Sequence, residues 1–249
     1  MEFRGSSVIV TGGAIGLGNT FCRRFAAEGA NVAVLDVDVD GARTLAATLA
    51  EGGVTALPVE CDIADEAMVT QAVEKVNIEF GGIDVLVNNA GRHLRKYGQP
   101  FSSLTSADVR ELFAVNLFGT IYCSLAVRDG MRLRGGGAIV NIASHAAHDV
   151  RNAYGVSKLA VRGVSAAFAH DYASDGIRVN TVSPGLVATE SMRDDFGEQH
   201  FARVVGEQLV AHPASPDDIA DVVLFLASPR SSFITGQTLL ANGGRSVYI

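Results

Sequence analysis

Short apolar runs alternate along the chain with stretches of helical periodicity. Val8-Ile9-Val10 is typical of a buried strand, and the residues after it place an apolar stripe on one helix face, at Phe21, Cys22, Phe25 and Ala26. Further strand-like runs lie at residues 32–35, 54–58, 83–87, 138–143, 177–182 and 237–240. Helical patterns lie at residues 39–51, 67–80, 105–133, 154–173 and 216–227. Strands and helices that alternate in this way predict an α/β fold.

A glycine-rich turn, Thr11-Gly12-Gly13-Ala14-Ile15-Gly16-Leu17-Gly18, joins the first strand to the first helix. Its spacing, Gly12-x3-Gly16-x-Gly18, differs from the GxGxxG of the usual dinucleotide fingerprint. Glycines let the backbone approach a pyrophosphate without a Cβ in the way, and the free N–H groups of the following helix face its charge. The turn therefore predicts an anion site with a dinucleotide as the expected occupant, and a plain tight turn is the alternative.

An acidic residue ends the second strand-like run. Asp36 lies 18 residues beyond Gly18, and no Arg or Lys lies within the glycine turn or directly after Asp36. A carboxylate at this position can accept hydrogen bonds from an adenosine ribose and would repel a 2′-phosphate. NAD is therefore the expected cofactor, and NADP is disfavoured. The alternative is a solvated acidic turn that caps the next helix.

Two features near later strand ends allow two interpretations each. Asp62 follows the third strand, where it would either contact an adenine amino group or cap the helix that begins near Glu66. A basic loop follows the fourth strand, with four cationic or titratable side chains in five residues: Arg92, His93, Arg95 and Lys96. This loop would either line a site for a polar or anionic substrate or form an exposed charged surface.

The pair Tyr154 and Lys158 carries the clearest chemical signal. The two residues are four apart on one helix face, which places their Cβ atoms about 5–6 Å apart. A phenol with a pKa of about 10 exchanges protons poorly at neutral pH unless its phenolate is stabilised, and a nearby ammonium supplies that stabilisation. Ser144 ends the preceding strand, and its hydroxyl could polarise a carbonyl or hold an alcohol. An exposed helix pair is the alternative for Tyr154 and Lys158 taken alone.

Two other stretches are notable without a mechanism. Asn116 lies inside the helix expected at residues 105–133, where a short amide is a mediocre helix former and needs a partner if buried. Residues 190–209 are polar and poorly periodic, with Met192, Phe196 and Phe201 as scattered apolar side chains. This stretch predicts either a mobile lid over a cleft or a pair of surface helices.

Composition limits the function classes. The chain has 249 residues and no linker-like segment, so we expect one domain over residues 1–249. Its 20 basic and 27 acidic residues give a net charge of −7, which argues against a nucleic-acid partner. No apolar run approaches a membrane span and no signal peptide is recognisable, so we expect a cytoplasmic protein without a membrane partner. Cys22, Cys61 and Cys123 are expected to be reduced structural thiols, with no metal site.

Together, these motifs resemble the short-chain dehydrogenase/reductase family. The matches follow the family's order over essentially the whole chain: Thr11 to Gly18, Asn88-Asn89-Ala90-Gly91, Asn116, Ser144, Tyr154 with Lys158, Asn180, Pro184-Gly185 and Ile234-Thr235-Gly236-Gln237. The resemblance implies a Rossmann-type, doubly wound domain with a seven-stranded parallel sheet and helices on both faces. It also implies an NAD-dependent enzyme that interconverts secondary alcohols and ketones, assembled as a homotetramer or homodimer.

The resemblance also assigns roles to residues. Asn116, Ser144, Tyr154 and Lys158 would form a catalytic tetrad, with Tyr154 as acid/base, Ser144 on the substrate oxygen and Lys158 on the nicotinamide ribose. The Asn116 backbone would position a water that relays protons, Asp62 would contact the adenine, and Thr189 the nicotinamide amide. The full set of expected cofactor contacts is Gly12, Ile15, Gly16, Leu17, Gly18, Asp36, Asp62, Ile63, Asn89, Ala90, Gly91, Tyr154, Lys158, Pro184, Gly185, Val187 and Thr189.

The substrate is the least determined part of the sequence interpretation. The interval from Ser144 to Tyr154 is shorter than the family commonly shows and lacks its frequent Pro-Gly, so an inherited substrate assignment does not transfer. A polar rim favours a sugar, polyol or hydroxy acid; its residues would be His93, Arg95, His145, His148 and Arg151. The alternatives are an apolar alcohol, steroid or terpenoid, a 3-oxoacyl-type ketoreductase, and a non-catalytic NAD(H)-sensing or scaffold protein. The candidate substrate contacts are His93, Ser144, His145, His148, Tyr154, Met192 and Phe196.

Overall fold

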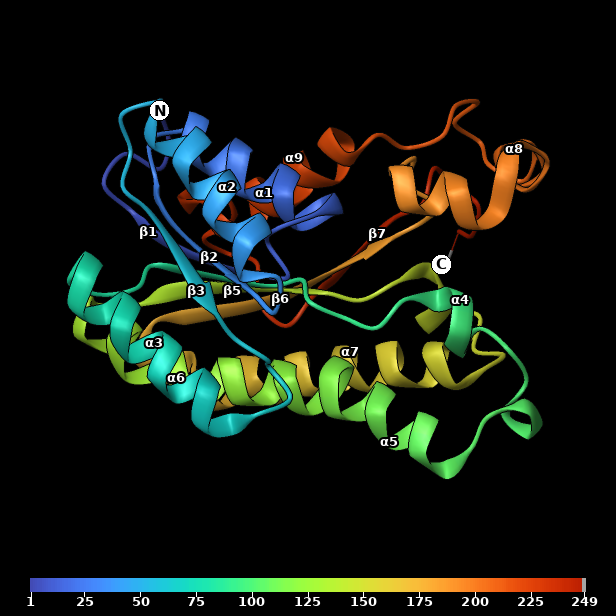
Figure 1. Ribbon diagram of the computed structural model, residues 1–249, viewed down its shortest axis with the longest axis horizontal. Coiled ribbons are helices and arrows are strands. Elements are labelled where there is room, and N and C mark those ends of the chain that lie inside the picture. Colours follow the sequence, from blue (N-terminus) through green and yellow to red (C-terminus); the bar gives the residue numbers. More distant parts are fainter. Residues whose placement is uncertain (248–249) are drawn as a thin grey trace.

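Residues 1–247 of the computed structural model contain a seven-stranded parallel sheet (Figure 1), and the side chains of Ser191, Asp194 and Asp195 are not described. The strands are β1 (Ser7–Thr11), β2 (Asn31–Asp36), β3 (Ala56–Glu60), β4 (Val85–Asn88), β5 (Gly137–Ile142), β6 (Ile177–Pro184) and β7 (Thr238–Ala241). Their order is β3-β2-β1-β4-β5-β6-β7, which confirms the predicted seven-stranded, doubly wound sheet. Strands β1 to β3 are added toward one edge of the sheet and β4 to β7 toward the other, so the strand order reverses between β1 and β4. Ligands of such folds bind beside that reversal point.

Helices cover both faces of the sheet (Figure 1). One face carries α1 (Gly16–Ala27), α2 (Val39–Ala50) and α9 (Pro216–Ala227), and the other carries α3 (Glu66–Phe80), α6 (Thr120–Leu133) and α7 (Ala153–Asp171). The short helices α4 (Leu94–Tyr97) and α5 (Ser106–Phe113) and the longer α8 (Glu190–Gly206) lie toward the end of the molecule where the strands finish (Figure 1). The remaining helical turns are η1 (Phe101–Ser103), η2 (Ala114–Gly119), η3 (His145–Ala147), η4 (Ala173–Asp175) and η5 (Pro229–Ser231).

Two apolar cores result, one on each face of the sheet. Val8 and Val10 of β1 pack into the core under α1, α2 and α9, whereas Ile9 between them packs into the core under α3, α6 and α7. Alternate residues of a strand point to opposite faces, so a strand buried on both sides reads as an unbroken apolar run. This explains why the strands appear in the sequence as short, unbroken apolar runs and not as an alternation of apolar and polar residues.

Three predicted segments differ from the structure in detail. The helix expected at residues 105–133 is interrupted, because α5 and α6 are joined by the π-helical segment η2. The loop after the fourth strand contains the short helix α4. Residues 190–206 form α8, whose backbone leaves helical geometry at Gly197 (φ 68°, ψ 167°), so the alternative of a surface helix pair describes the segment. Its role as a lid stays a prediction.

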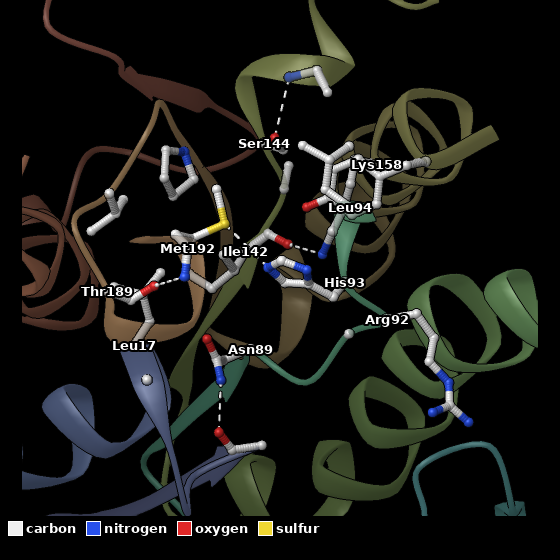
Figure 2. A pocket seen from close by; sticks show the side chains of 18 of the residues that line it. Leu17, Asn89, Arg92, His93, Leu94, Ile142, Ser144, Lys158, Thr189 and Met192 are labelled. Carbon is white, nitrogen blue, oxygen red and sulfur yellow. Dashed lines mark hydrogen bonds between the residues drawn. The ribbon is translucent and has the colours of Figure 1, made fainter. Parts of the chain in front are cut away.

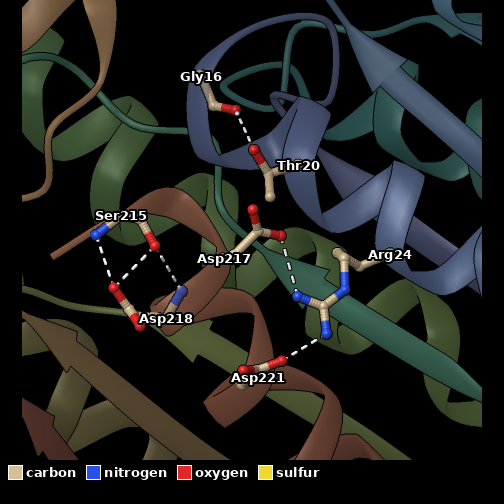
Figure 3. A network of polar contacts seen from close by, with 7 residues as sticks. All are labelled: Gly16, Thr20, Arg24, Ser215, Asp217, Asp218 and Asp221. Carbon is tan, nitrogen blue, oxygen red and sulfur yellow. Dashed lines mark hydrogen bonds and ion pairs between the residues drawn. The ribbon is translucent and has the colours of Figure 1, made fainter.

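An ion-pair network holds α1 against α9. Arg24 of α1 donates to Asp217 at 2.9 Å and also to Asp221, one helical turn further along α9 (Figure 3). The same helix begins with a capping box, because Ser215 and Asp218 exchange side-chain to backbone hydrogen bonds of 2.7 and 3.2 Å. Exposed ion pairs contribute little stability, so the network mainly fixes the orientation of the two helices.

The three cysteines lie in the interior of the protein. Cys22, Cys61 and Cys123 are buried, free thiols, as the sequence predicted, and burial raises the pKa of Cys61 to about 11. Among the helices of residues 1–247, none combines the length and apolar character that a membrane span requires.

Arg178 joins the sheet to the end of α9. Its guanidinium donates to the carbonyl of Leu226 (2.9 Å), the carbonyl of Ser228 (3.1 Å) and the hydroxyl of Ser231 (2.9 Å). Carbonyls at a helix C-terminus carry partial negative charge, so they stabilise a cation without a carboxylate. Burial lowers the pKa of Arg178, because the guanidinium loses hydration.

We predict that Arg178→Met lowers the free energy of unfolding by about 2–3 kcal/mol, because it leaves buried acceptors without donors. Arg178→Lys, which keeps one donor group, should fall between this variant and the wild type. Denaturant unfolding at a fixed protein concentration measures both. An unchanged midpoint for Arg178→Met would contradict the assigned role.

Candidate active site

A cavity of about 630 Å³ lies where the strands end, beside the reversal point between β1 and β4. The segments that follow β1, β4, β5 and β6 all contribute to its walls, as do residues of α7 and α8. Figure 2 shows Ser144, Lys158, His93 and Met192 gathered around it. This volume is in the usual range for cavities that bind cofactors and small molecules.

The glycine turn forms one end of this cavity. Gly12 has φ +62°, and a Cβ there would lie 2.8 Å from Cα of Ala90, so no other residue fits between the turn and the end of β4. Gly16 has φ +57° with open space in front of it, and Gly18 packs against the carbonyl of Gly12 rather than lining the cavity. A backbone exposed in this way at the start of α1 fits the approach of a pyrophosphate.

Asn89 fixes the turn in place. Its Nδ2 donates to the carbonyls of Thr11 (3.0 Å) and Gly12 (2.9 Å), and one of these bonds is drawn in Figure 2. The Thr11 hydroxyl in turn accepts hydrogen bonds from the backbone N–H groups of Asn89 and Ala90. The segments after β1 and β4 are therefore joined into one rigid wall, with Gly91 continuing it.

Asp36 lines the same end of the cavity, and it does not cap the next helix. One carboxylate oxygen accepts from the N–H of Ala14 (2.9 Å), and the other accepts from the N–H of Asp38 (3.0 Å). Asp38 is the residue that caps α2. Asp36 thus orders the glycine turn, and its oxygens remain at the cavity wall.

The capping alternative also fails for Asp62. Asp65 caps α3 by accepting from the N–H groups of Ala67 and Met68, whereas Asp62 accepts from the N–H of Ala64 at 2.9 Å. Asp62 and its neighbour Ile63 line the cavity near the end of β3. This position is compatible with a contact to an adenine ring.

Ser144 and Tyr154 face the same cavity. Ser144 follows the end of β5, and Tyr154 lies in the first turn of α7. Burial raises the pKa of Tyr154, and the nearby Ser144 hydroxyl acts in the opposite direction. The serine therefore offsets part of the cost of forming a phenolate at this partly buried position.

Lys158 lies one helical turn after Tyr154 and is 5% exposed. Its ammonium donates to the carbonyl of Ile142 at 2.8 Å, which is the dashed bond between the two residues in Figure 2. Burial lowers the pKa of Lys158 to about 8. At neutral pH the ammonium is mostly protonated, so a positive charge is held beside the tyrosine.

Asn116 acquires its partners from two other segments. Its Oδ1 accepts from the N–H of Arg92 (2.7 Å), and its Nδ2 donates to the hydroxyl of Ser157 on α7 (3.0 Å). The residue lies in the π-helical segment η2 and does not line the cavity. A π-helical turn inside a longer helix often marks a functional site. Here it brings the amide between the loop after β4 and the helix of Tyr154 and Lys158.

Most of the expected cofactor contacts line the cavity. Those that do are Gly12, Ile15, Gly16, Leu17, Asp36, Asp62, Ile63, Asn89, Ala90, Gly91, Tyr154, Lys158, Pro184, Gly185, Val187 and Thr189. A Cβ at Gly91 would lie 3.2 Å from Oδ1 of Asn116 and 3.3 Å from Nζ of Lys158, so a glycine lets these groups approach the wall. A dinucleotide is the group that this combination of backbone and donors fits best.

The expected substrate contacts divide into two groups. His93, Ser144, His145, Tyr154 and Met192 line the cavity, but His148 and Phe196 do not. Phe196 instead packs its ring 4.8 Å from that of His200. Nε2 of His93 lies 3.1 Å from the sulfur of Met192, which joins α4 to α8 across the cavity (Figure 2).

Two cations of the basic loop have their charged groups paired with α5, although Arg92 also lines the cavity. Arg92 pairs with Glu111 at 2.9 Å, and Lys96 pairs with Asp108 at 2.7 Å, both on α5. Figure 2 shows the Arg92 guanidinium directed away from Ser144 and Lys158. The contacts of these two residues favour the charged-surface alternative over a substrate site.

Sequence reasoning missed several residues that line the cavity, above all His200 of α8 and Arg245, which follows β7. Arg245 pairs with Glu207 at 2.6 Å, just after the end of α8. No local spacing connects these positions. An unexplained cation near the end of the chain, with an acidic residue, Glu207, inside the irregular segment 190–209, was the available signal.

The comparisons with known proteins agree with this geometry. A family model described as enoyl-(acyl carrier protein) reductase matches residues 12–246. The D-threitol dehydrogenase of Mycolicibacterium smegmatis is 38% identical, with 99% of this chain and 95% of the relative covered. The D-xylose 1-dehydrogenase of Caulobacter vibrioides is 34% identical, with 98% and 96% covered. A solved 7α-hydroxysteroid dehydrogenase in complex with NADH and 7-oxo glycochenodeoxycholic acid has a TM-score of 0.92 and 30% identity, with 98% and 95% covered.

These matches extend over nearly the full length of the chain and of each relative. The sheet order and the cavity described above are found in the same chain that carries the matching motifs. The chain therefore belongs to the short-chain dehydrogenase/reductase family and shares its oxidoreductase fold.

Proposed function

We propose that this protein is an NAD-dependent oxidoreductase that interconverts a secondary alcohol and a ketone, with a small polar molecule as substrate. The observation that carries the proposal is that Ser144, Tyr154 and the buried ammonium of Lys158 line one cavity, with Lys158 one helical turn from Tyr154. These groups face a cavity whose other end is the exposed backbone of the glycine turn and Asp36. A cofactor and a substrate would meet between the two ends.

In this mechanism Ser144 donates a hydrogen bond to the substrate oxygen and holds it against Tyr154. During oxidation Tyr154 takes the hydroxyl proton, and during reduction it returns that proton to the forming alcohol. Lys158 stabilises the phenolate form through its charge, and its anchor on Ile142 keeps the ammonium close. A nicotinamide bound at the cavity would supply or accept the hydride.

The cavity residues suggest which part of a dinucleotide each would hold. The glycine turn and the N-terminus of α1 suit the pyrophosphate, and Asp36 suits the adenosine ribose. Asp62 and Ile63 would flank the adenine. The segment from Pro184 to Thr189 would hold the nicotinamide end, near Tyr154 and Lys158.

The polar substrate class is supported by the lining beyond Ser144 and by the polyol and sugar dehydrogenases among the relatives. An apolar alcohol or steroid is the second candidate, because Leu186, Met192 and Val204 also line the cavity and a solved relative is a hydroxysteroid dehydrogenase.

Four other expectations stay predictions of the sequence: a 3-oxoacyl substrate, a sensor without turnover, a cytoplasmic location, and a homotetramer or homodimer. A screen of NADH formation across sugars, hydroxy acids and apolar alcohols separates the substrate classes.

We predict that Tyr154→Phe lowers turnover by about 10²- to 10⁴-fold while leaving NADH affinity nearly intact, because it removes the proton carrier and little volume. Steady-state kinetics and NADH fluorescence titration measure the two quantities. Tyr172→Phe is the matched control, because it removes a buried hydroxyl that donates to the Ser124 carbonyl far from the cavity. A Tyr154→Phe enzyme that keeps most of its rate would remove Tyr154 from its proposed role.

We further predict that Asp36→Asn narrows the preference for NAD over NADP by about tenfold or more, since it removes the charge that repels a 2′-phosphate. The substitution keeps an oxygen that can accept from Ala14, so the glycine turn should remain ordered. The readout is the ratio of kcat/KM values with the two cofactors. Asp40→Asn, at an exposed acid paired with Arg43, is the control. An unchanged ratio for Asp36→Asn would show that the carboxylate does not face the ribose.

A further inference from the structure

Three side chains from distant segments form the polar end of the cavity beyond Ser144. His145 follows Ser144 directly, His200 lies on α8, and Arg245 follows β7, and all three line the cavity. A chain of contacts joins them: Arg245 pairs with Glu207, which also pairs with Arg203, and Arg203 lies 3.4 Å from the His200 ring. Asn242, three residues before Arg245, lies 3.2 Å from Nδ1 of His145.

Neighbouring donors determine which nitrogen of His145 carries its proton. Oδ1 of Asn242 accepts from the N–H of Gly244 (3.0 Å), which sets the orientation of the amide. Its Nδ2, which can only donate, lies 3.2 Å from Nδ1 of His145. Nδ1 of the neutral ring must accept this bond, so Nε2 carries the hydrogen and is a donor.

The same reasoning applies to His200. Nη2 of Arg203 lies 3.4 Å from Nδ1 of His200, and a guanidinium can only donate. The proton of the neutral His200 ring is therefore on Nε2. Burial is the main cause that lowers the pKa of both imidazoles, with nearby arginines adding to it, so both rings are neutral donors at neutral pH.

Among the side chains that the structure describes, positive charge exceeds negative charge at this end of the cavity. Glu207 is shared by Arg203 (2.8 Å) and Arg245 (2.6 Å), so two guanidinium groups have one carboxylate between them. The other carboxylate nearby, Asp149, is paired with Arg151 at 2.7 Å. Two neutral hydrogen-bond donors and an excess guanidinium form a surface that favours a ligand group with hydrogen-bond acceptors and no donors.

We propose that His145, His200 and Arg245 bind a carboxylate of the substrate, so that the substrate is a hydroxy acid and the product its oxo acid. This inference rests on the proposed function for the alcohol chemistry at Ser144 and Tyr154. It narrows that function, because a neutral sugar, a neutral polyol or a sterol would leave the excess guanidinium without an anion. The adjacency of Ser144 and His145 favours a short acid, with few carbons between the carbinol and the carboxylate.

Binding of simple carboxylates tests the site without turnover. The enzyme saturated with NADH is titrated calorimetrically with acetate, butyrate and hexanoate, and with the amide of each acid. We expect at least one acid to bind about tenfold or more tightly than its amide, and Arg245→Gln to abolish that difference. Acids and amides that bind equally, or a difference that persists in Arg245→Gln, would overturn the proposal.

Two further variants separate recognition from a structural role. Glu207→Gln breaks the same ion pair as Arg245→Gln but leaves the guanidinium in place, so carboxylate affinity should be kept or increased. If Arg245 merely anchors the segment after β7, both variants should weaken binding alike, and the proposal fails. Arg132→Gln is the matched control, because this arginine pairs with Asp129 and does not line the cavity, and binding should be unchanged.

Oxidation assays separate this inference from the proposed function. NADH formation is measured with both enantiomers of 3-hydroxybutyrate and with 1,3-butanediol, which has the same carbon skeleton without the charge. In one outcome the diol is oxidised at the same rate as the acids while carboxylates bind no more tightly than amides. That result refutes the carboxylate site and leaves the alcohol chemistry standing. If no alcohol is oxidised but carboxylates bind in an Arg245-dependent manner, the carboxylate site stands and the proposed function fails.

Discussion

The buried ammonium of Lys158 is the constraint on which the site depends. A charge that is 5% exposed loses its hydration, and the structure gives it one short hydrogen bond to the carbonyl of Ile142 at the end of β5. This arrangement lowers the pKa of Lys158 to about 8 and still leaves most of the population charged at neutral pH. In the proposed mechanism this positive charge stabilises the phenolate of Tyr154, which is partly buried one helical turn away and lines the same cavity as Ser144.

The rest of the fold keeps this charge in position. Lys158 and Tyr154 lie on α7, the Ile142 carbonyl ends β5, and Asn116 in η2 joins α7 to the loop after β4. Gly91 has no side chain, so Asn116 and Lys158 can both approach that loop closely. On the other side of the reversal point, Asn89 and Asp36 hold the glycine turn in a fixed shape. The proposed cofactor and substrate ends are therefore built on elements that share one sheet edge.

Local spacing was enough to predict the parts of this site that lie on one element. The glycine turn, the pair Tyr154 and Lys158, and Ser144 at a strand end each follow from short sequence patterns, and the cavity contains all of them. Asn116 needed the family resemblance, because its partners Arg92 and Ser157 come from other segments. The second role of Asp36, as acceptor for the N–H of Ala14, has no sequence signature.

The substrate end was predicted least well, for a physical reason. Arg92 and Lys96 looked available in the sequence, but the tertiary fold places them beside Glu111 and Asp108 of α5. Conversely, His200 and Arg245 line the cavity, where α8 bends at Gly197 and Arg245 pairs with Glu207. Long-range packing decides both outcomes, and no periodicity along the chain encodes it.

The pH dependence of alcohol oxidation tests the role of the buried charge most directly. With the alcohol that the wild type oxidises fastest, kcat/KM should rise with pH as Tyr154 loses its proton. In Lys158→Met the midpoint of this rise should move to higher pH by about one unit or more, because removing a nearby positive charge disfavours the phenolate. Lys75→Met, at an exposed lysine on α3, should keep the wild-type profile. An unchanged midpoint in Lys158→Met would contradict the assignment of Lys158 as the group that makes Tyr154 a base.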